Sequence, residues 1–209
     1  MKSLLILMTL YLQGCSQIYY STWEMLGKQK RDLLRDNVEN LAYDQKGVHE
    51  EVADALTRLR SLYGSPDDKL VTVYDQLKSD YDDAKSKADS LHARVEKVDE
   101  IASDLFEEWN DEISKLRTPK YKSDSRNKLN RTKDRYRKLH ASMIKSERSL
   151  KPVLSALEEQ VIYLKHNLNA QALGSIKGEV TAIESEIKTL TASLESSIGE
   201  SQAFINSLD

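Results

Sequence analysis

The apolar positions between Leu70 and Leu116 recur at alternating steps of four and three residues. These positions form a seam, in which Glu112 alone is charged. The seam consists of Leu70, Tyr74, Leu77, Tyr81, Ala84, Ala88, Leu91, Val95, Val98, Ala102, Leu105, Trp109, Glu112 and Leu116. The alternation predicts a continuous helix with one narrow buried stripe. A helix over this segment is about 70 Å long at ~1.5 Å per residue, and it must pack against equally long neighbours.

Three other segments repeat the same spacing. The first runs from about Ile18 to Tyr63, with its seam at Leu34, Val38, Leu41, Gln45, Val48, Val52, Ala55, Leu59 and Leu62. The next is capped by Ser123 or Asp124 and continues to Leu168, with its seam at Leu129, Thr132, Tyr136, Leu139, Met143, Ser146, Leu150, Val153, Leu157, Val161, Leu164 and Leu168. Because the seam keeps its phase through Pro152, we expect this helix to kink there; the alternative is a fresh helix capped by Ser149. The last runs from Leu173 to Leu208. Breaks are predicted at Gly64–Pro66 and at Thr118–Pro119, where Gly and Pro end helices.

The join between the last two helices contains neither Gly nor Pro, and the heptad phase slips between Leu168 and Leu173. Either a tight turn capped by Asn169 or a continuous helix with a stutter explains this slip. The similar lengths of the four segments favour the turn. The predicted fold is therefore all-α: an elongated antiparallel coiled-coil bundle of about four long helices, forming a single domain over residues 15–209.

The first residues have the pattern of an export signal. A positive start at Lys2 precedes the apolar run Leu4–Leu12, which is far shorter than the ~20 residues of a membrane-spanning helix. The run ends in Leu12-Gln13-Gly14-Cys15, which resembles the bacterial lipobox. This resemblance implies a signal peptide over residues 1–14 and lipid attachment at Cys15. The alternative is an ordinary cleaved signal peptide followed by an incidental thiol.

Further motifs resemble a known family. They are Leu105-Phe106-Glu107-Glu108-Trp109 and, most specifically, Leu164-Lys165-His166-Asn167-Leu168-Asn169-Ala170. Together they resemble predicted lipoproteins of Gram-negative bacteria that are grouped as a domain of unknown function. The resemblance implies a helical, membrane-tethered periplasmic protein, and it supplies no catalytic residues. Because Ser16 and not Asp follows the cysteine, lipoprotein sorting in these bacteria implies the periplasmic face of the outer membrane.

Charge is balanced overall but segregated locally. The formal net charge is −3, which does not favour nucleic-acid binding. Residues 120–151 contain twelve Lys or Arg against three acidic residues, and residues 96–112 contain eight acidic residues against one Lys. We expect the two blocks to pair across the Pro119 turn. The alternative places the basic patch, formed by Lys120, Lys122, Arg126, Lys128 and Arg131, against lipid headgroups.

Motifs for catalysis are missing from the sequence, so no enzyme, metal site or cofactor is predicted. Asp89 and His92 share a helix face, but one such pair is too little for a metal, and no Glu-x-x-His occurs. Lys165, His166, Asn167 and Asn169 form a candidate interaction surface. The alternative for these residues is a capped helix junction.

These observations favour a membrane-anchored periplasmic coiled-coil lipoprotein with a structural or adaptor role in the cell envelope. Its expected partners are the membrane, through the N-terminal lipid, and an envelope protein or a second copy of the chain. The alternative is a lipid- or membrane-binding helical module in envelope stress or transport.

Overall fold

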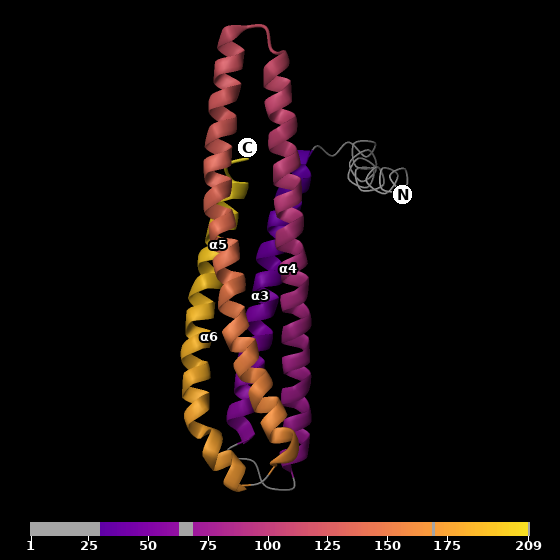
Figure 1. Cartoon of the computed structure of the whole chain (residues 1–209), viewed down its shortest axis with the longest axis vertical. Coiled ribbons are helices and arrows are strands. Elements are labelled where there is room, and N and C mark those ends of the chain that lie inside the picture. The colour runs from indigo at the N-terminus through magenta and orange to yellow at the C-terminus, as the bar shows by residue number, and fades with distance from the viewer. Residues whose placement is uncertain (1–29, 63–68, 169, 209) are drawn as a thin grey trace, which may run out of the picture.

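The computed structural model describes residues 30–62, 69–168 and 170–208, which form four long antiparallel helices (Figure 1). They are α3 (Lys30–Leu62), α4 (Leu70–Lys115), α5 (Pro119–His166) and α6 (Ala170–Ile205). Helices that follow one another in the sequence pack together, and α3 closes the ring by packing against α6. The predicted all-α four-helix bundle is confirmed. The signal peptide, Cys15, the start of the first predicted helix, the Gly64–Pro66 turn and Asn169 lie outside the described residues.

The core follows the predicted seams closely on three helices. All nine seam positions of α3 are buried, as are all those named above from Leu129 to Leu164 on α5. On α6, the described seam is buried at Val180, Ile183, Ile187, Leu190, Leu194, Ser197, Ser201 and Phe204. Because these stripes meet along the whole bundle, one continuous apolar core holds the four helices together. None of the described helices is long and apolar enough to cross a membrane.

The seam of α4 departs from the prediction after Ala102. Phe106 and Ile113 are buried, whereas the predicted Leu105 and Trp109 are half-buried and Glu112 and Leu116 are exposed. Two consecutive steps of four, from Val98 to Ala102 and on to Phe106, replace the four-three alternation. Such an insertion turns the buried stripe around the helix. This change in the seam occurs close to Glu108, which pairs with Lys30, the first described residue of α3. Among the described residues, α4 therefore packs against α3 before this level and not beyond it.

Trp109 is thus a partly exposed side chain with a polar role. Its indole Nε1 donates to Ser125 Oγ at 2.9 Å, and the Arg31 guanidinium lies 5.7 Å from its ring centroid.

We expect Trp109→Ala to lower the free energy of unfolding by about 2 kcal/mol, less than the ~3–5 kcal/mol of a fully buried ring. Urea titration measures this loss. Ser125→Ala should reproduce about 1 kcal/mol of it, and a Trp109→Ala loss above 4 kcal/mol would contradict the partial exposure.

The turn between α4 and α5 is tighter than predicted. α5 begins at Pro119 itself and not after Ser123 or Asp124, with Thr118 as its N-cap residue. Proline suits this position because the first helical N–H has no partner within the helix. Further along, α5 is a single helix through Pro152, so no new helix starts at Ser149. A turn at Asn167 then separates α5 from α6, which confirms the turn rather than a continuous helix.

The α4–α5 hairpin extends beyond the other two helices at one end of the bundle (Figure 1). Lys30 Nζ meets Glu108 Oε2 at 2.9 Å, which places the start of α3 seven residues before the end of α4. Arg135 Nη1 lies 3.5 Å from the Ser207 carbonyl oxygen, which places the end of α6 well short of Pro119. At ~1.5 Å per residue, the last 10–20 Å or so of the hairpin extends past the described residues of α3 and α6. We call residues 114–123 the hairpin tip.

A polar layer crosses the middle of the core. Gln45 on α3 is fully buried, and its Nε2 donates to Ser146 Oγ on α5 at 3.2 Å and to Ser197 Oγ on α6 at 2.8 Å. These bonds tie three helices together at one level. Gln45 Oε1 is buried and has no hydrogen-bond partner among the described residues.

Candidate functional site

The hairpin tip concentrates positive charge on exposed side chains. Residues 114–123 contain four cations, Lys115, Arg117, Lys120 and Lys122, and no acidic residue. All four are exposed. Lys122 Nζ reaches only the Ser114 carbonyl oxygen, at 3.5 Å, and within the described part of the chain the other three have no partner. The tip is therefore a cationic surface that forms no ion pair, within the described residues, with the exposed carboxylates of Asp111, Glu112 and Asp124 that flank it.

The predicted pairing of the two charge blocks was wrong for the basic patch. Within the described ranges, none of Lys120, Lys122, Arg126, Lys128 and Arg131 forms an ion pair with a carboxylate; Arg126 Nη1 instead donates to Asn110 Oδ1 at 2.5 Å. Asp99 accepts bonds from the Tyr136 hydroxyl and from His140 Nε2. Among the described residues, the ion pairs that a Lys or Arg forms between helices all involve α3, as in Arg94 Nε with Asp44 Oδ2 at 3.0 Å.

Two apolar side chains accompany the charge at the tip. Tyr121 is 62 % exposed and Leu116 is 37 % exposed. The exposure of Leu116 differs from its predicted place in the buried seam, and Tyr121 belongs to no predicted seam. Their exposure follows from the start of α5 at Pro119, which leaves no further turn of helix to cover them. An exposed Tyr among Lys and Arg is typical of surfaces at a membrane–water interface.

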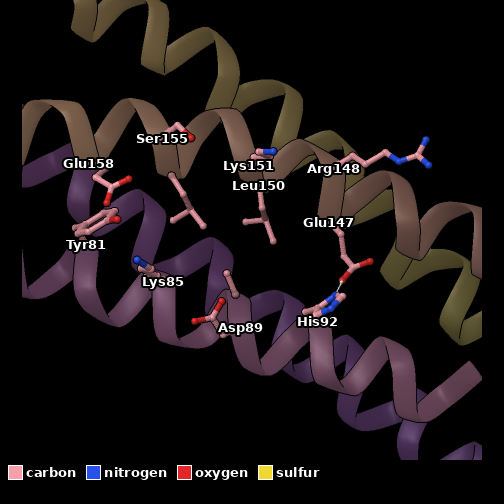
Figure 2. Close-up of a pocket in the computed structure, with 12 residues that line it drawn as sticks. Tyr81, Lys85, Asp89, His92, Glu147, Arg148, Leu150, Lys151, Ser155 and Glu158 are labelled. Atoms are coloured by element: carbon pink, nitrogen blue, oxygen red, sulfur yellow. Dashed lines mark hydrogen bonds and ion pairs between the residues drawn. The ribbon is translucent and has the colours of Figure 1, made fainter. Parts of the chain in front are cut away.

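A groove of about 520 Å³ lies between α4 and α5, farther along the bundle (Figure 2). Its floor is apolar: Leu150 and the half-buried Leu154 of α5 face Ala88 of α4. Because Ala88 has a short side chain, α4 does not fully cover Leu154 at this level. Figure 2 shows Lys85, Asp89, Lys151 and other charged side chains around the rim.

The polar groups of the groove pair with one another across the two helices. His92 Nδ1 lies 2.8 Å from Glu147 Oε1, and this hydrogen bond, with the charges of Glu147 and Glu96, raises the pKa of His92. Burial, assisted by the Glu158 carboxylate, raises the pKa of Tyr81 to about 12, so its hydroxyl stays protonated at neutral pH. The His92–Glu147 and Tyr81–Glu158 interactions therefore connect α4 to α5 along the groove.

A family model, described as "Protein of unknown function (DUF2959)", matches residues 19–208. The chain belongs to the DUF2959 family. The match spans every described helix, so the four-helix bundle is the DUF2959 domain, as the Leu164–Ala170 motif indicated. No curated protein matches the chain.

In the predicted interaction surface at the end of α5, Asn167 caps the helix. In the DUF2959 bundle, Asn167 Nδ2 donates to the Tyr163 carbonyl oxygen at 2.9 Å, and the Asn167 backbone N–H donates to the Leu164 carbonyl at 3.1 Å. These bonds satisfy carbonyls that a helix end leaves unpaired, which is what the capped-junction alternative predicts. Lys165 and His166 are exposed, and their role in binding stays a prediction.

Metal ligation has no support in the DUF2959 residues that the structure describes. Among them, no group of three or more His, Cys, Asp or Glu side chains could hold a metal ion. Asp89 and His92 both line the groove, but His92 is committed to Glu147.

Proposed function

We propose that this DUF2959 protein is a lipid-anchored helical rod of the outer membrane. Its lipid is attached at Cys15, and its bundle projects into the periplasm with a non-catalytic structural or adaptor role in the envelope. The observation that carries the proposal is the combination of a signal-like leader ending in Leu12-Gln13-Gly14-Cys15 with a domain whose described residues form an elongated bundle.

The energetics of the anchor support a stable membrane association. Lipidation of such a cysteine gives a diacylglyceryl group and an N-acyl chain, and each buried CH₂ contributes ~0.8 kcal/mol. A rod supported by one continuous core and a polar layer at Gln45 holds its ends far apart. A rigid spacer of about 70 Å is suited to presenting a binding surface at a distance from the membrane.

The anchor is tested by replacing Cys15. We expect Cys15→Ala to abolish lipid attachment and the membrane association that depends on it, with metabolic labelling by a radioactive fatty acid as the readout. A matched variant, Ser16→Asp, keeps the cysteine and should move the lipidated protein from outer-membrane to inner-membrane fractions. If the wild-type chain takes up no fatty acid, the lipoprotein proposal is wrong.

The adaptor role predicts a stable partner. Crosslinking in intact envelopes, followed by isolation of the lipidated protein, should yield a discrete complex with another envelope protein or with a second copy. If the protein is crosslinked only to lipids, the second candidate function applies: a membrane-binding helical module. The exposed cationic tip is the observation that favours this second candidate.

A further inference from the structure

The hairpin tip combines three features that point to one kind of partner. It carries four exposed cations, no acidic residue, and the exposed apolar side chains of Leu116 and Tyr121. We propose that the hairpin tip binds the surface of an anionic phospholipid membrane, through its four cations and with Tyr121 and Leu116 at the headgroup level. The inference rests on the proposed function in one respect, because the lipid at Cys15 would place the tip beside a membrane.

The topology brings the tip to the anchored end of the rod. α3 begins at Lys30, at the same end of the bundle as the turn between α4 and α5 (Figure 1). Fourteen residues lie between Cys15 and Lys30, and a chain of that length can span up to roughly 50 Å. Since the hairpin extends past the start of α3, the tip can reach the membrane that holds the lipid.

Charge complementarity favours phospholipid over the other partners of a cationic surface. Within the described residues no carboxylate forms an ion pair with the four tip cations, so binding to anionic headgroups breaks no internal ion pair. Basic side chains attract an anionic surface only within a Debye length of ~8 Å. The four tip cations lie within about two turns of the hairpin end, whereas Lys138 is nineteen residues from Pro119, or roughly 28 Å along α5.

The exposed side chains of Tyr121 and Leu116 favour a membrane over an acidic protein as the partner of the tip. An acidic protein would also bind Lys and Arg, but a mobile headgroup layer accommodates a Tyr ring and a Leu side chain at its boundary with the acyl chains. Tyr121 lies between Lys120 and Lys122 in the sequence, in the first turn of α5. The tip therefore has the composition of an interfacial membrane contact.

Binding is measured with the chain that begins at Ser16, which keeps every described residue and lacks the lipid. We expect it to sediment with vesicles of phosphatidylcholine and phosphatidylglycerol at low ionic strength, and to be released by high salt or by omitting phosphatidylglycerol. Changing Lys115, Arg117, Lys120 and Lys122 to Gln should weaken binding roughly 10²–10³-fold. Circular dichroism checks that the helices persist.

A matched variant removes the same charge from the body of α5. Lys138, Lys145, Arg148 and Lys151 are exposed and have no ion pair among the described residues, and their replacement by Gln should leave vesicle binding nearly unchanged. Equal losses in the two variants would mean that overall charge, and not the tip, attracts the membrane, which overturns the proposal. Absence of wild-type binding, or binding of an acidic protein without any binding of vesicles, also overturns it.

Insertion of the tip is read out separately. Cys15 is the only cysteine of the chain, so a chain beginning at Ser16 can be labelled at a single introduced thiol. An environment-sensitive fluorophore at Tyr121→Cys should brighten and shift to the blue on anionic vesicles. The same fluorophore at Tyr43→Cys, on the 76 % exposed Tyr43 of α3, should not respond. Equal responses at the two positions would contradict a tip-first contact, and neither result depends on Cys15, so this proposal can fail while the lipid anchor stands.

Discussion

Phe204→Ala should lower the free energy of unfolding by about 3–5 kcal/mol. Phe204 of α6 is 1 % exposed, and its ring packs edge-on against Tyr136 of α5, with the centroids 5.7 Å apart. Tyr136 packs in the same way against Phe106 of α4 at 5.6 Å. Removing the Phe204 ring leaves a cavity and ends an aromatic cluster that joins three helices just below the point where the hairpin leaves the bundle.

Urea unfolding followed by circular dichroism measures this loss, and two variants serve as controls. Tyr136→Phe keeps the cluster and removes only the hydroxyl that donates to Asp99, so its cost should be about 1–2 kcal/mol. Val71→Ala changes a side chain that is 58 % exposed and should be nearly neutral. A Phe204→Ala loss below 1 kcal/mol would mean that α6 does not close the core at this level.

The spacing of apolar residues predicted the fold because each long apolar seam must be buried against other helices along its whole length. The seams of α3 and, as far as Leu164, of α5 were correct at each position, even at Gln45, Thr132 and Ser146, because the heptad phase fixes which face is buried whatever residue occupies it. Leu168, the last position predicted for the α5 seam, lies beyond the end of α5 and is half-buried. The same reasoning failed on α4 after Ala102. There the neighbours of the helix change, and a single sequence contains no signal for where a partner helix starts.

Charge and surface features were less predictable than the core. Opposite charge blocks in adjacent helices suggested pairing, but pairing needs side chains on facing sides, and the basic residues of residues 120–131 occur at too many helical angles to face α4 together. The groove depends on Ala88 lying opposite Leu154, a juxtaposition set by the packing of two helices. The tip could have been found from Pro119, because proline at the first helical position places the N-cap of α5 at Thr118, five residues before Ser123.

Gln45→Glu should lower the free energy of unfolding as much as Phe204→Ala, although it only replaces the side-chain amide by a carboxylate. Gln45 is fully buried, and its Nε2 donates to Ser146 Oγ and Ser197 Oγ. A carboxylate there loses both donors and places an uncompensated charge in the core, so we expect a loss of about 3–5 kcal/mol at neutral pH. Gln45→Leu removes the amide and its unpartnered Oε1 without adding charge, and should change stability by about 1 kcal/mol or less.

The pH dependence of the unfolding free energy distinguishes the cost of a buried charge at position 45 from the cost of altered packing. Burial would raise the pKa of the new carboxyl at position 45 above its unfolded value of about 4.3. Below that value the carboxyl is protonated in both states, and the difference in unfolding free energy between Gln45→Glu and the wild type should nearly vanish. As the pH rises the unfolded chain releases its proton first, so the variant loses stability progressively until the folded-state pKa is passed. Unfolding of both proteins across about pH 4–8 measures this difference, and a pH-independent loss, or an equal loss in Gln45→Leu, would show that packing rather than desolvation of charge governs the layer.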